Sequence, residues 1–154
     1  MGSTADTVRL LAVDIGNQQI KLGLFLGDSG NPLPSPAEIW RISTGEPSFE
    51  SLAPRLPPAP LAWCAATVHR PAEQQLAAWV RQRRPQDSYR LLQAQDLPLA
   101  IHVDQPRRVG SDRLLAAVAV NRLRAPDRAA IVIDAGTPIT IDLVSAAGAF
   151  EGGV

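Results

Sequence analysis

VRLLAVDIGNQQIKLGLFL, residues 8–26, contains the pattern that decides the fold: an apolar run, a short polar turn and an alternating run. Residues 8–13 are apolar except for Arg9, which is typical of a buried strand. From Ile20 onward, apolar side chains recur at every second position, the period of a pleated strand. Asp14 ends the first run and Gly16 lies in the turn. We therefore expect two strands joined by a tight turn.

AAIVIDAGTPITIDL, residues 129–143, repeats this scheme, and its Asp134 stands 120 positions after Asp14. Gly136 again follows the acidic residue by two positions. In both copies we expect the glycine to permit a turn that other residues resist, with backbone N–H groups available to phosphate oxygens. A single Asp-x-Gly is typical of any hairpin turn. Two copies that each follow a buried strand favour an ATP site built from two turns.

A third pattern, PRRVGSDR at residues 106–113, stands immediately before an apolar helical stretch at residues 114–123. Ser111 or Asp112 is a candidate helix cap, because short oxygen-bearing side chains accept hydrogen bonds from the free N–H groups of a first turn. In the functional alternative, Asp112 accepts a proton from a hydroxyl group while Arg113 holds an anionic ligand. The residues alone leave both interpretations open.

Taken in order, these motifs resemble the type III pantothenate kinases, a family of the ASKHA superfamily (acetate and sugar kinases, Hsp70, actin). The resemblance covers nearly the whole chain, and its most specific element is the Gly-x-Asp-Arg sequence. The matching residues are 14–17, Lys21, 23–25, Pro106, 110–113, 134–137, Thr140, Asp142, Gly148 and 150–153.

The resemblance implies an α/β fold of the ASKHA type, which is actin/Hsp70/sugar-kinase-like and ribonuclease H-like, with a central mixed sheet whose early strands form antiparallel hairpins. Residues 1–128 are expected to form the N-terminal domain, and residues 129–154 the start of a second domain that is truncated. We therefore expect a fragment or a truncated product that is inactive alone. It would expose apolar surface over residues 139–154 unless another chain covers it.

The implied reaction is the ATP-dependent phosphorylation of pantothenate to 4′-phosphopantothenate, the first step of coenzyme A biosynthesis. Asp112 is similar to the catalytic base of the family. Arg113 has an evident partner in the pantothenate carboxylate, since a guanidinium can pair with it bidentately. The implied substrate-binding residues are Gly110, Ser111, Asp112 and Arg113, and the implied ATP- or phosphate-binding residues are Asp14, Ile15, Gly16, Asn17, Gln18, Gln19, Ile20, Lys21, Gly136 and Thr137.

The resemblance also implies ions and an assembly. Asp14 is expected near Mg²⁺ and the transferring phosphate, with Lys21 offsetting phosphate charge, and Asp134 matches the position that binds a monovalent cation, K⁺ or NH₄⁺. We expect Asp14 and Asp134 to lie close together at the floor of one cleft. Because the family is dimeric and residues 114–123 are apolar on more than one face, we expect that helix to be buried, partly against a second subunit.

Three residues depart from the family pattern: Gln18 stands where a threonine is usual, Pro138 where alanine is common, and Val103 where a tyrosine often lies. Two other interpretations therefore stay open. One is a catalytically weak or inactive paralogue that binds nucleotide or pantothenate as a regulatory accessory protein. The other is a small-molecule kinase of the same group with a different hydroxyl acceptor. Retention of both Asp14 and Asp112 argues for catalysis.

Composition favours an ordinary globular protein in the cytoplasm. The chain has 154 residues, 45% of them apolar and 19% charged, and fifteen basic residues balance fifteen acidic ones. This balance gives no argument for a nucleic-acid or membrane partner, and the N-terminus fits neither a signal peptide nor a membrane span. Cys64 is the only cysteine, within an apolar run at residues 61–66 that predicts a buried strand.

The remaining elements are expected to be short. Strands are predicted at residues 39–42 and 89–92, an irregular connection with one helical turn at 46–60, and a helix at 71–84 that ends in a solvated arginine cluster. His69 and His102 are isolated, and we interpret both as surface or strand-end residues. The predicted core face of the helix consists of Ala72, Leu76, Trp79 and Val80, and the arginine cluster of Arg81, Arg83 and Arg84.

Overall fold

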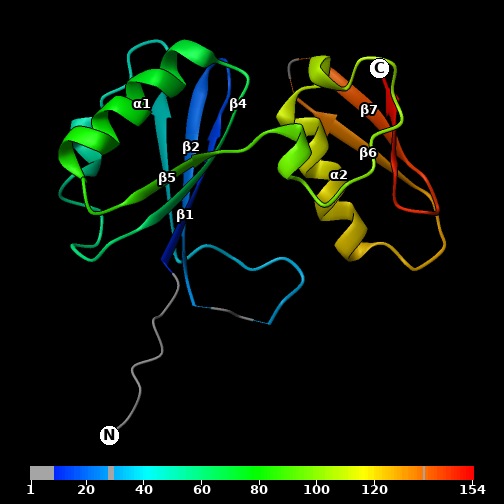
Figure 1. Ribbon diagram of the computed structural model, residues 1–154, viewed down its shortest axis with the longest axis horizontal. Helices are drawn as coiled ribbons and strands as arrows, with labels where there is room; N and C mark the ends of the chain where they lie inside the picture. The colour runs from blue at the N-terminus through cyan, green and yellow to red at the C-terminus, as the bar shows by residue number, and fades with distance from the viewer. Residues whose placement is uncertain (1–8, 28–29, 137) are drawn as a thin grey trace, which may run out of the picture. The chain divides into compact units, whose positions relative to one another are not determined.

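The computed structural model describes residues 9–27, 30–136 and 138–154, so Val8 and Thr137 lie outside the described residues. The chain divides into two compact units, Met1–Leu91 and Leu92–Val154. A five-stranded sheet forms in the first unit and a three-stranded sheet in the second (Figure 1). The predicted domain boundary between residues 128 and 129 stays a prediction.

The sheet of the first unit is mixed and has the order β3-β2-β1-β4-β5. β1 pairs with β2, and β2 with β3, in antiparallel fashion, whereas β4 is parallel to both β1 and β5. The expected α/β fold with a mixed sheet and early antiparallel hairpins is therefore confirmed. The strands are β1 (Arg9–Ile15), β2 (Gln19–Leu26), β3 (Glu38–Ser43), β4 (Ala62–Thr67) and β5 (Ser88–Leu91).

Helix α1 (Arg70–Arg83) lies along one face of this sheet (Figure 1). Pro71 occupies its first turn, where a missing N–H does no harm. His69 is the N-cap, and its Nδ1 accepts a hydrogen bond from the Ala72 N–H at 3.2 Å, a role that the sequence did not indicate. The predicted core face is confirmed, because Ala72, Leu76, Trp79 and Val80 are all buried.

The core of the first unit consists of the inward side chains of the sheet and those of α1. Alternation along β4 places Trp63 and Ala65 in this core, while Cys64 points to the other face and is only half-buried. The predicted strand is thus confirmed, but Cys64 within it does not belong to the buried core. A 3₁₀ turn at Phe49–Leu52 supplies the single helical turn expected in the connection before β4.

Arg84 departs from the predicted solvated cluster at the end of α1. Arg81 and Arg83 are exposed as expected, but Arg84 is buried and its Nε donates to Asp87 Oδ2 at 2.8 Å. Asp87 also accepts hydrogen bonds from the Trp63 indole N–H at 2.7 Å and from the Leu61 N–H at 3.1 Å. The turn between α1 and β5 is therefore closed by a buried ion pair whose acidic partner lies beyond the helix.

The second unit contains helix α2 (Ser111–Leu123) and an antiparallel sheet of order β6-β7-β8. The segment around Ile101 runs parallel to β8, with hydrogen bonds from His102 N–H to Phe150 O and from Phe150 N–H to Ala100 O, both 2.8 Å. His102 is exposed at this strand end, as predicted. The strands are β6 (Ala130–Ala135), β7 (Ile139–Val144) and β8 (Phe150–Gly153), and 3₁₀ turns form at Ala94–Asp96 and Pro106–Arg108.

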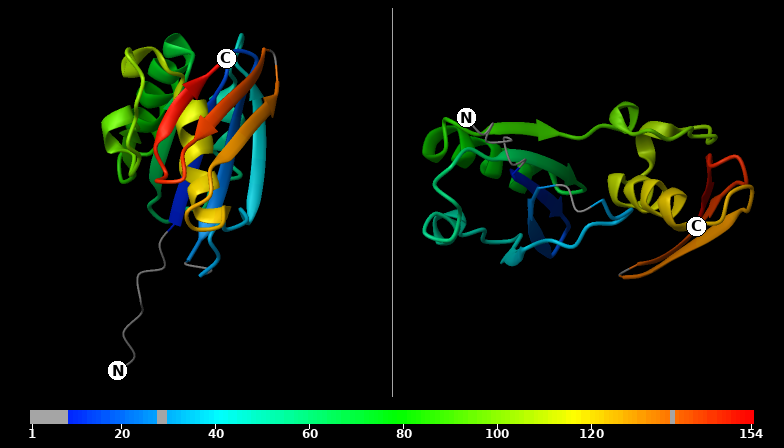
Figure 2. Two further views of the ribbon diagram at one scale, coloured as in Figure 1. Left: turned by 90° about the vertical axis from the view of Figure 1, so that its right-hand side faces the viewer. Right: turned by 90° about the horizontal axis from the view of Figure 1, so that it is seen from below.

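Helix α2 lies along one face of this sheet (Figure 2). Leu114 and Ala117 of the helix pack against Val144 and Phe150 of the sheet, and all four are buried. On the opposite face the apolar side chains are exposed, which makes the prediction of a buried strand wrong for the second copy of the pattern. These exposed side chains are Ile131, Ile133, Ile139, Ile141 and Leu143, with exposed fractions from 42 to 67%.

Within the described residues, no helix is both long enough and apolar enough to cross a membrane.

Candidate functional site

The first predicted phosphate loop is the β1–β2 turn, and it is braced from β3. The Gly16 N–H donates to Gln19 O at 3.0 Å across the turn. Thr44, a buried residue just after β3, donates its hydroxyl to Gly16 O at 2.9 Å and its N–H to Gln18 O at 3.0 Å. These contacts hold the turn in one conformation before any ligand arrives.

The two turn glycines differ in whether the turn requires a glycine. Among the described residues, the glycines with positive φ are Gly27, Gly30, Gly148 and Gly152, so neither Gly16 nor Gly136 needs the left-handed region. At Gly16 the constraint is steric, because an added Cβ would lie 3.2 Å from Gln19 O. At Gly136 the nearest atom would be at 3.5 Å, an ordinary van der Waals contact.

Asp14 and Lys21 face each other across the hairpin, as a registered pair whose Nζ and Oδ2 atoms are 3.6 Å apart. Both side chains are about half exposed, so the pair itself adds little stability. Asp14 points away from the core, whereas the side chains of Ile15 and Ile20 are completely buried in it. Both isoleucines are among the predicted phosphate-binding residues, but only their backbone groups are available to a phosphate.

The second predicted loop joins β6 to β7 and is shorter than the first. Residues 136–138 separate the last pair of this hairpin, Ala135 and Ile139, whereas residues 16–19 separate Ile15 from Ile20 in the first. Asp134 is exposed and stands opposite Thr140. Gly136 and Pro138 are exposed too.

The Gly-x-Asp-Arg element begins helix α2. The N-cap of the helix is Gly110, which has no side chain to accept a capping hydrogen bond. Neither Ser111 nor Asp112 is therefore the cap. The capping interpretation was wrong because both residues lie inside the helix. Asp112 is exposed, and its Oδ1 accepts the Arg113 N–H at 2.9 Å. A carboxylate in the first turn also interacts favourably with the helix dipole.

Arg113 is paired with a residue of its own unit rather than pointing freely to solvent. Its Nε donates to both carboxylate oxygens of Asp142 on β7, at 3.1 and 2.9 Å, and Nη2 donates to Asp142 Oδ1 as well. The Asp142 side chain is only 2% exposed. The bidentate contact expected for a substrate carboxylate is thus made by Asp142, whose role the sequence did not indicate.

A cavity of about 430 Å³ lies beside this pair. Arg113, Val109 and Val103 line it, so the position where the family often has tyrosine faces the cavity with an apolar side chain. His102 and Glu151 form an exposed pair at its wall, with Nδ1 and Oε1 3.1 Å apart. The remaining lining residues are Asp104, Gln105, Arg108, Phe150, Gly152 and Gly153.

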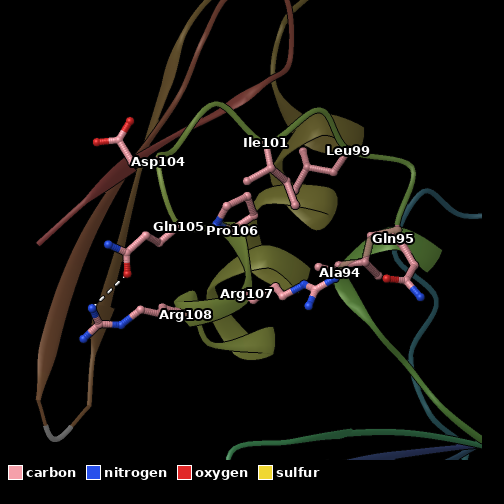
Figure 3. Close-up of a pocket in the computed structure, with 10 residues that line it drawn as sticks. Ala94, Gln95, Leu99, Ile101, Asp104, Gln105, Pro106, Arg107 and Arg108 are labelled. Carbon is pink, nitrogen blue, oxygen red and sulfur yellow. Dashed lines mark hydrogen bonds between the residues drawn. The ribbon is translucent and has the colours of Figure 1, made fainter.

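A second cavity, of about 640 Å³, shares Asp104, Gln105 and Arg108 with the first. Figure 3 shows Leu99 and Ile101 side by side at one end and the Arg107 side chain extending toward Ala94. Arg108 instead donates from Nη1 to Gln105 Oε1 at 2.9 Å (Figure 3). Asp104, Gln105 and Arg108 therefore border both the larger, mainly apolar cavity and the more polar one that Arg113 lines.

The predicted metal ligands of the two turns are two separate carboxylates, Asp14 and Asp134. No group of three or more His, Cys, Asp or Glu side chains suited to a metal ion occurs among the residues that the structure describes. Mg²⁺ in phosphoryl-transfer sites is held by one or two carboxylates together with substrate phosphates. Asp14 fits that mode, because its exposed carboxylate stands next to the turn. Asp134 likewise offers one exposed carboxylate.

Comparisons with known proteins identify the family of this chain. The model of the family "Type III pantothenate kinase" matches residues 10–154. A type III pantothenate kinase of Thermus thermophilus is 36% identical over 154 residues, covering 94% of this chain and 58% of its own length. One of Rubrobacter xylanophilus is 32% identical over 152 residues, covering 94% of this chain and 56% of its own.

The mixed sheet with its antiparallel hairpin is an α/β fold consistent with the N-terminal part of an ASKHA-type kinase. The chain belongs to the type III pantothenate kinase family. It spans less than three fifths of the length of these two relatives, 58% and 56%.

Proposed function

We propose that the protein transfers the γ-phosphoryl group of ATP to the primary hydroxyl of pantothenate, in the first step of coenzyme A biosynthesis. The start of α2 carries this proposal. There an exposed carboxylate, Asp112, stands next to Arg113, a cationic side chain that lines a polar cavity. An alcohol needs a proton acceptor during phosphoryl transfer, and an anionic substrate needs a cation to hold it.

In this proposal Asp112 accepts the hydroxyl proton, and residues 110–113 bind pantothenate. The β1–β2 turn, residues 14–21, binds ATP phosphates through its braced backbone and Lys21, and the second turn contributes Gly136 and Thr137. Asp14 holds Mg²⁺ together with a phosphate, and Asp134 holds K⁺ or NH₄⁺. The divalent ion would supply neutralisation of the charge that develops on the phosphate oxygens.

The proposal includes an assembly and a domain organisation. Residues 1–128 would form the N-terminal ASKHA domain and residues 129–154 would begin the second one. The protein would act as a homodimer in the cytoplasm, with the partly exposed side of α2 against a second subunit. Leu123, which is 61% exposed, and the half-buried Leu115 and Val118 support an additional packing partner for this helix.

The decisive experiment measures ADP release by the full-length protein with ATP, Mg²⁺ and K⁺, with and without pantothenate. We expect release that depends on pantothenate and a product heavier by one phosphoryl group in mass spectrometry. Omission of K⁺ should reduce the rate. ADP release that is absent, or equal with and without pantothenate, would contradict the assignment.

One observation favours a second candidate, a nucleotide- or pantothenate-binding accessory protein with weak or no catalysis. Pro138 has no N–H, so the second turn offers one phosphate donor fewer than an alanine would. Gln18 in turn replaces a hydroxyl in the first turn with a longer amide. Calorimetric binding of ATP or pantothenate without any turnover would identify this function instead.

A further inference from the structure

The ion pair between Arg113 and Asp142 is unusual because its carboxylate is buried while its guanidinium is partly exposed. The Asp142 carboxylate is 2% exposed, whereas a quarter of the Arg113 side chain is exposed at the 430 Å³ cavity. The hydrogen bonds to the Asp142 carboxylate come from Arg113, through Nε and Nη2. A carboxylate in such a place is costly unless its cation stays fixed beside it.

Several residues shape the surroundings of this pair. The Phe150 ring lies 5.9 Å from the Arg113 guanidinium carbon, a cation–π distance. Gly153 leaves room for Asp142, because a Cβ there would lie 2.7 Å from Asp142 Oδ1 and 1.9 Å from Ile141 O. The hydrogen bond from Arg113 to Asp142 also raises the pKa of the guanidinium. The terminal motif, residues 150–153, thus encloses Arg113 from the β8 side.

The hydrogen bonds to Asp142 use one edge of the guanidinium, Nε and Nη2. A guanidinium has five N–H donors in a rigid plane, so when one edge is fixed, the direction of the remaining nitrogen, Nη1, is also fixed. A pair that served only stability would be poorly explained here, since well-packed apolar residues stabilise a core as well as a buried ion pair does.

We propose that Asp142 is a positioning residue that holds Arg113 as a preformed receptor for the carboxylate of the acceptor substrate. This inference rests on the proposed function of the same site. Asp142 touches neither the substrate nor the reacting atoms. It acts through Arg113, whose Nη1 we assign to the ligand carboxylate, and Phe150 keeps the guanidinium plane from rotating away.

The polarity of the cavity agrees with a carboxylate as ligand. Besides Arg113, its charged or titratable side chains are Arg108, His102, Asp104 and Glu151. The Glu151 Oε1 atom lies 3.1 Å from His102 Nδ1, within hydrogen-bonding distance. Two arginines therefore line the cavity: Arg108 is hydrogen-bonded to the exposed Gln105 amide, and Arg113 is held by a buried carboxylate.

The test compares pantothenate with pantothenol, which has a hydroxymethyl group in place of the carboxylate but keeps the acceptor hydroxyl. In the full-length protein, Asp142→Asn keeps the shape of the side chain but cannot accept both bonds from the Arg113 edge. Asp142→Glu keeps the charge and displaces it by one methylene. We expect both variants to raise the KM for pantothenate about 10-fold, the value of one charge-assisted hydrogen bond, and to change kcat and the KM for pantothenol little.

Asp87→Asn is the matched control, because Asp87 is a buried carboxylate that an arginine contacts through two nitrogens in the other unit. It should lower the melting temperature without changing the ratio of the two KM values. In an Arg113→Ala background, Asp142→Asn should have no further effect on the pantothenate KM, since Asp142 acts only through Arg113.

A measurement without substrate separates this inference from the proposed function. In nitrogen-15 NMR, the Arg113 Nε–H should exchange slowly in the unsubstituted protein and broaden or shift in Asp142→Asn. If the protein does not phosphorylate pantothenate, the proposed function fails, and an unchanged Arg113 signal in Asp142→Asn overturns the positioning role. Equal losses for pantothenate and pantothenol, or tighter pantothenate binding by Asp142→Asn, would also overturn it.

Discussion

The two hairpins of this protein share one sequence pattern but differ in burial. In the β1–β2 hairpin, the inward residues are fully buried under α1, and Ile20 immediately after the turn is 0% exposed. In the β6–β7 hairpin, α2 covers one face only, and Ile139, the first residue of β7, is 64% exposed. An apolar run ending in Asp therefore predicts a strand, while its burial depends on what packs against the sheet.

The difference extends to the polar groups. In the first unit the buried Asp87 accepts hydrogen bonds from Arg84, Trp63 and Leu61, so it is held from several directions. In the second unit the Asp142 carboxylate is held by Arg113, which borders a cavity. The first unit contains a closed core, whereas one apolar face of the sheet in the second unit is exposed.

The largest expected effect tests whether the second unit supplies the proton acceptor. Asp112→Asn in the full-length protein should lower kcat by about 10²- to 10⁴-fold, the usual contribution of a positioned base. Asparagine retains an oxygen for the Arg113 N–H, so the melting temperature should change little. Asp127→Asn is the control, because Asp127 is exposed in the same unit and its positive φ suits asparagine. A near-normal kcat in Asp112→Asn would contradict the role of Asp112 as the proton acceptor.

The second prediction compares the two isoleucines that follow the turns. Ile20→Ala should destabilise the chain by about 3 kcal/mol, because it leaves a cavity in a packed core. Ile139→Ala should cost less than about 0.5 kcal/mol in residues 1–154, since its side chain is already exposed. Urea unfolding of both variants measures the difference. Equal losses would show that the β6–β7 face is covered, for example by a second copy of the chain.

The third prediction compares the two buried ion pairs. Arg113→Ala removes the cation that holds the Asp142 carboxylate and should cost about 3–5 kcal/mol of unfolding free energy, in addition to lost pantothenate affinity. Adding Asp142→Asn should restore part of this stability. Arg84→Ala should cost less, because Asp87 keeps two further donors. Thermal unfolding of the four variants would contradict this account if Arg84→Ala were the more damaging of the two arginine changes.

The smallest effect concerns Tyr89 in the first unit, whose hydroxyl donates to Glu73 Oε1 at 3.1 Å. Burial, followed by the negative charge of Glu73, raises the pKa of Tyr89 above its ordinary value of 10.0. The unfolded chain loses this proton near pH 10 and the folded chain does not, so the associated stability is complete below pH 10 and falls as the pH rises further.

Tyr89 is the only tyrosine of the chain, so tyrosinate absorbance reports on this residue alone. The absorbance should rise above pH 10 together with unfolding, and Tyr89→Phe should flatten the loss of stability in that range. Half-titration of Tyr89 near pH 10 in the folded protein would show that the hydroxyl is not sequestered.

Local pattern was sufficient for most elements of the fold. The alternation after Asp14 and after Asp134 correctly predicted β2 and β7, and the apolar spacing from Ala72 to Val80 correctly predicted the buried face of α1. The helical stretch at residues 114–123 was also predicted correctly, although the helix begins earlier, at Ser111 within the Gly-x-Asp-Arg element. These successes rest on side-chain periodicity, which depends only on near neighbours in the chain.

Local sequence patterns could not predict the roles of several residues. Asp142 was among the family matches, but its role depends on Arg113, 29 positions earlier. Gly153 is needed because β8 passes close to the backbone of Ile141, which only the sheet register reveals. His69 caps α1 with a ring nitrogen, which has no simple sequence signal.

The amino-acid sequence by itself determined the strands other than β8, the two α-helices, the family and the residues that we propose for catalysis, because each of these depends on short patterns or matched motifs. Only the tertiary structure decided that Arg113 is held by Asp142, that Ile15 and Ile20 are core residues, and that the apolar side chains Ile131 and Ile133 of β6 are exposed. Burial and ion pairing are set by which distant segments meet. Short sequence patterns do not contain these contacts, because the sheet register and the helix packing decide which distant segments lie together.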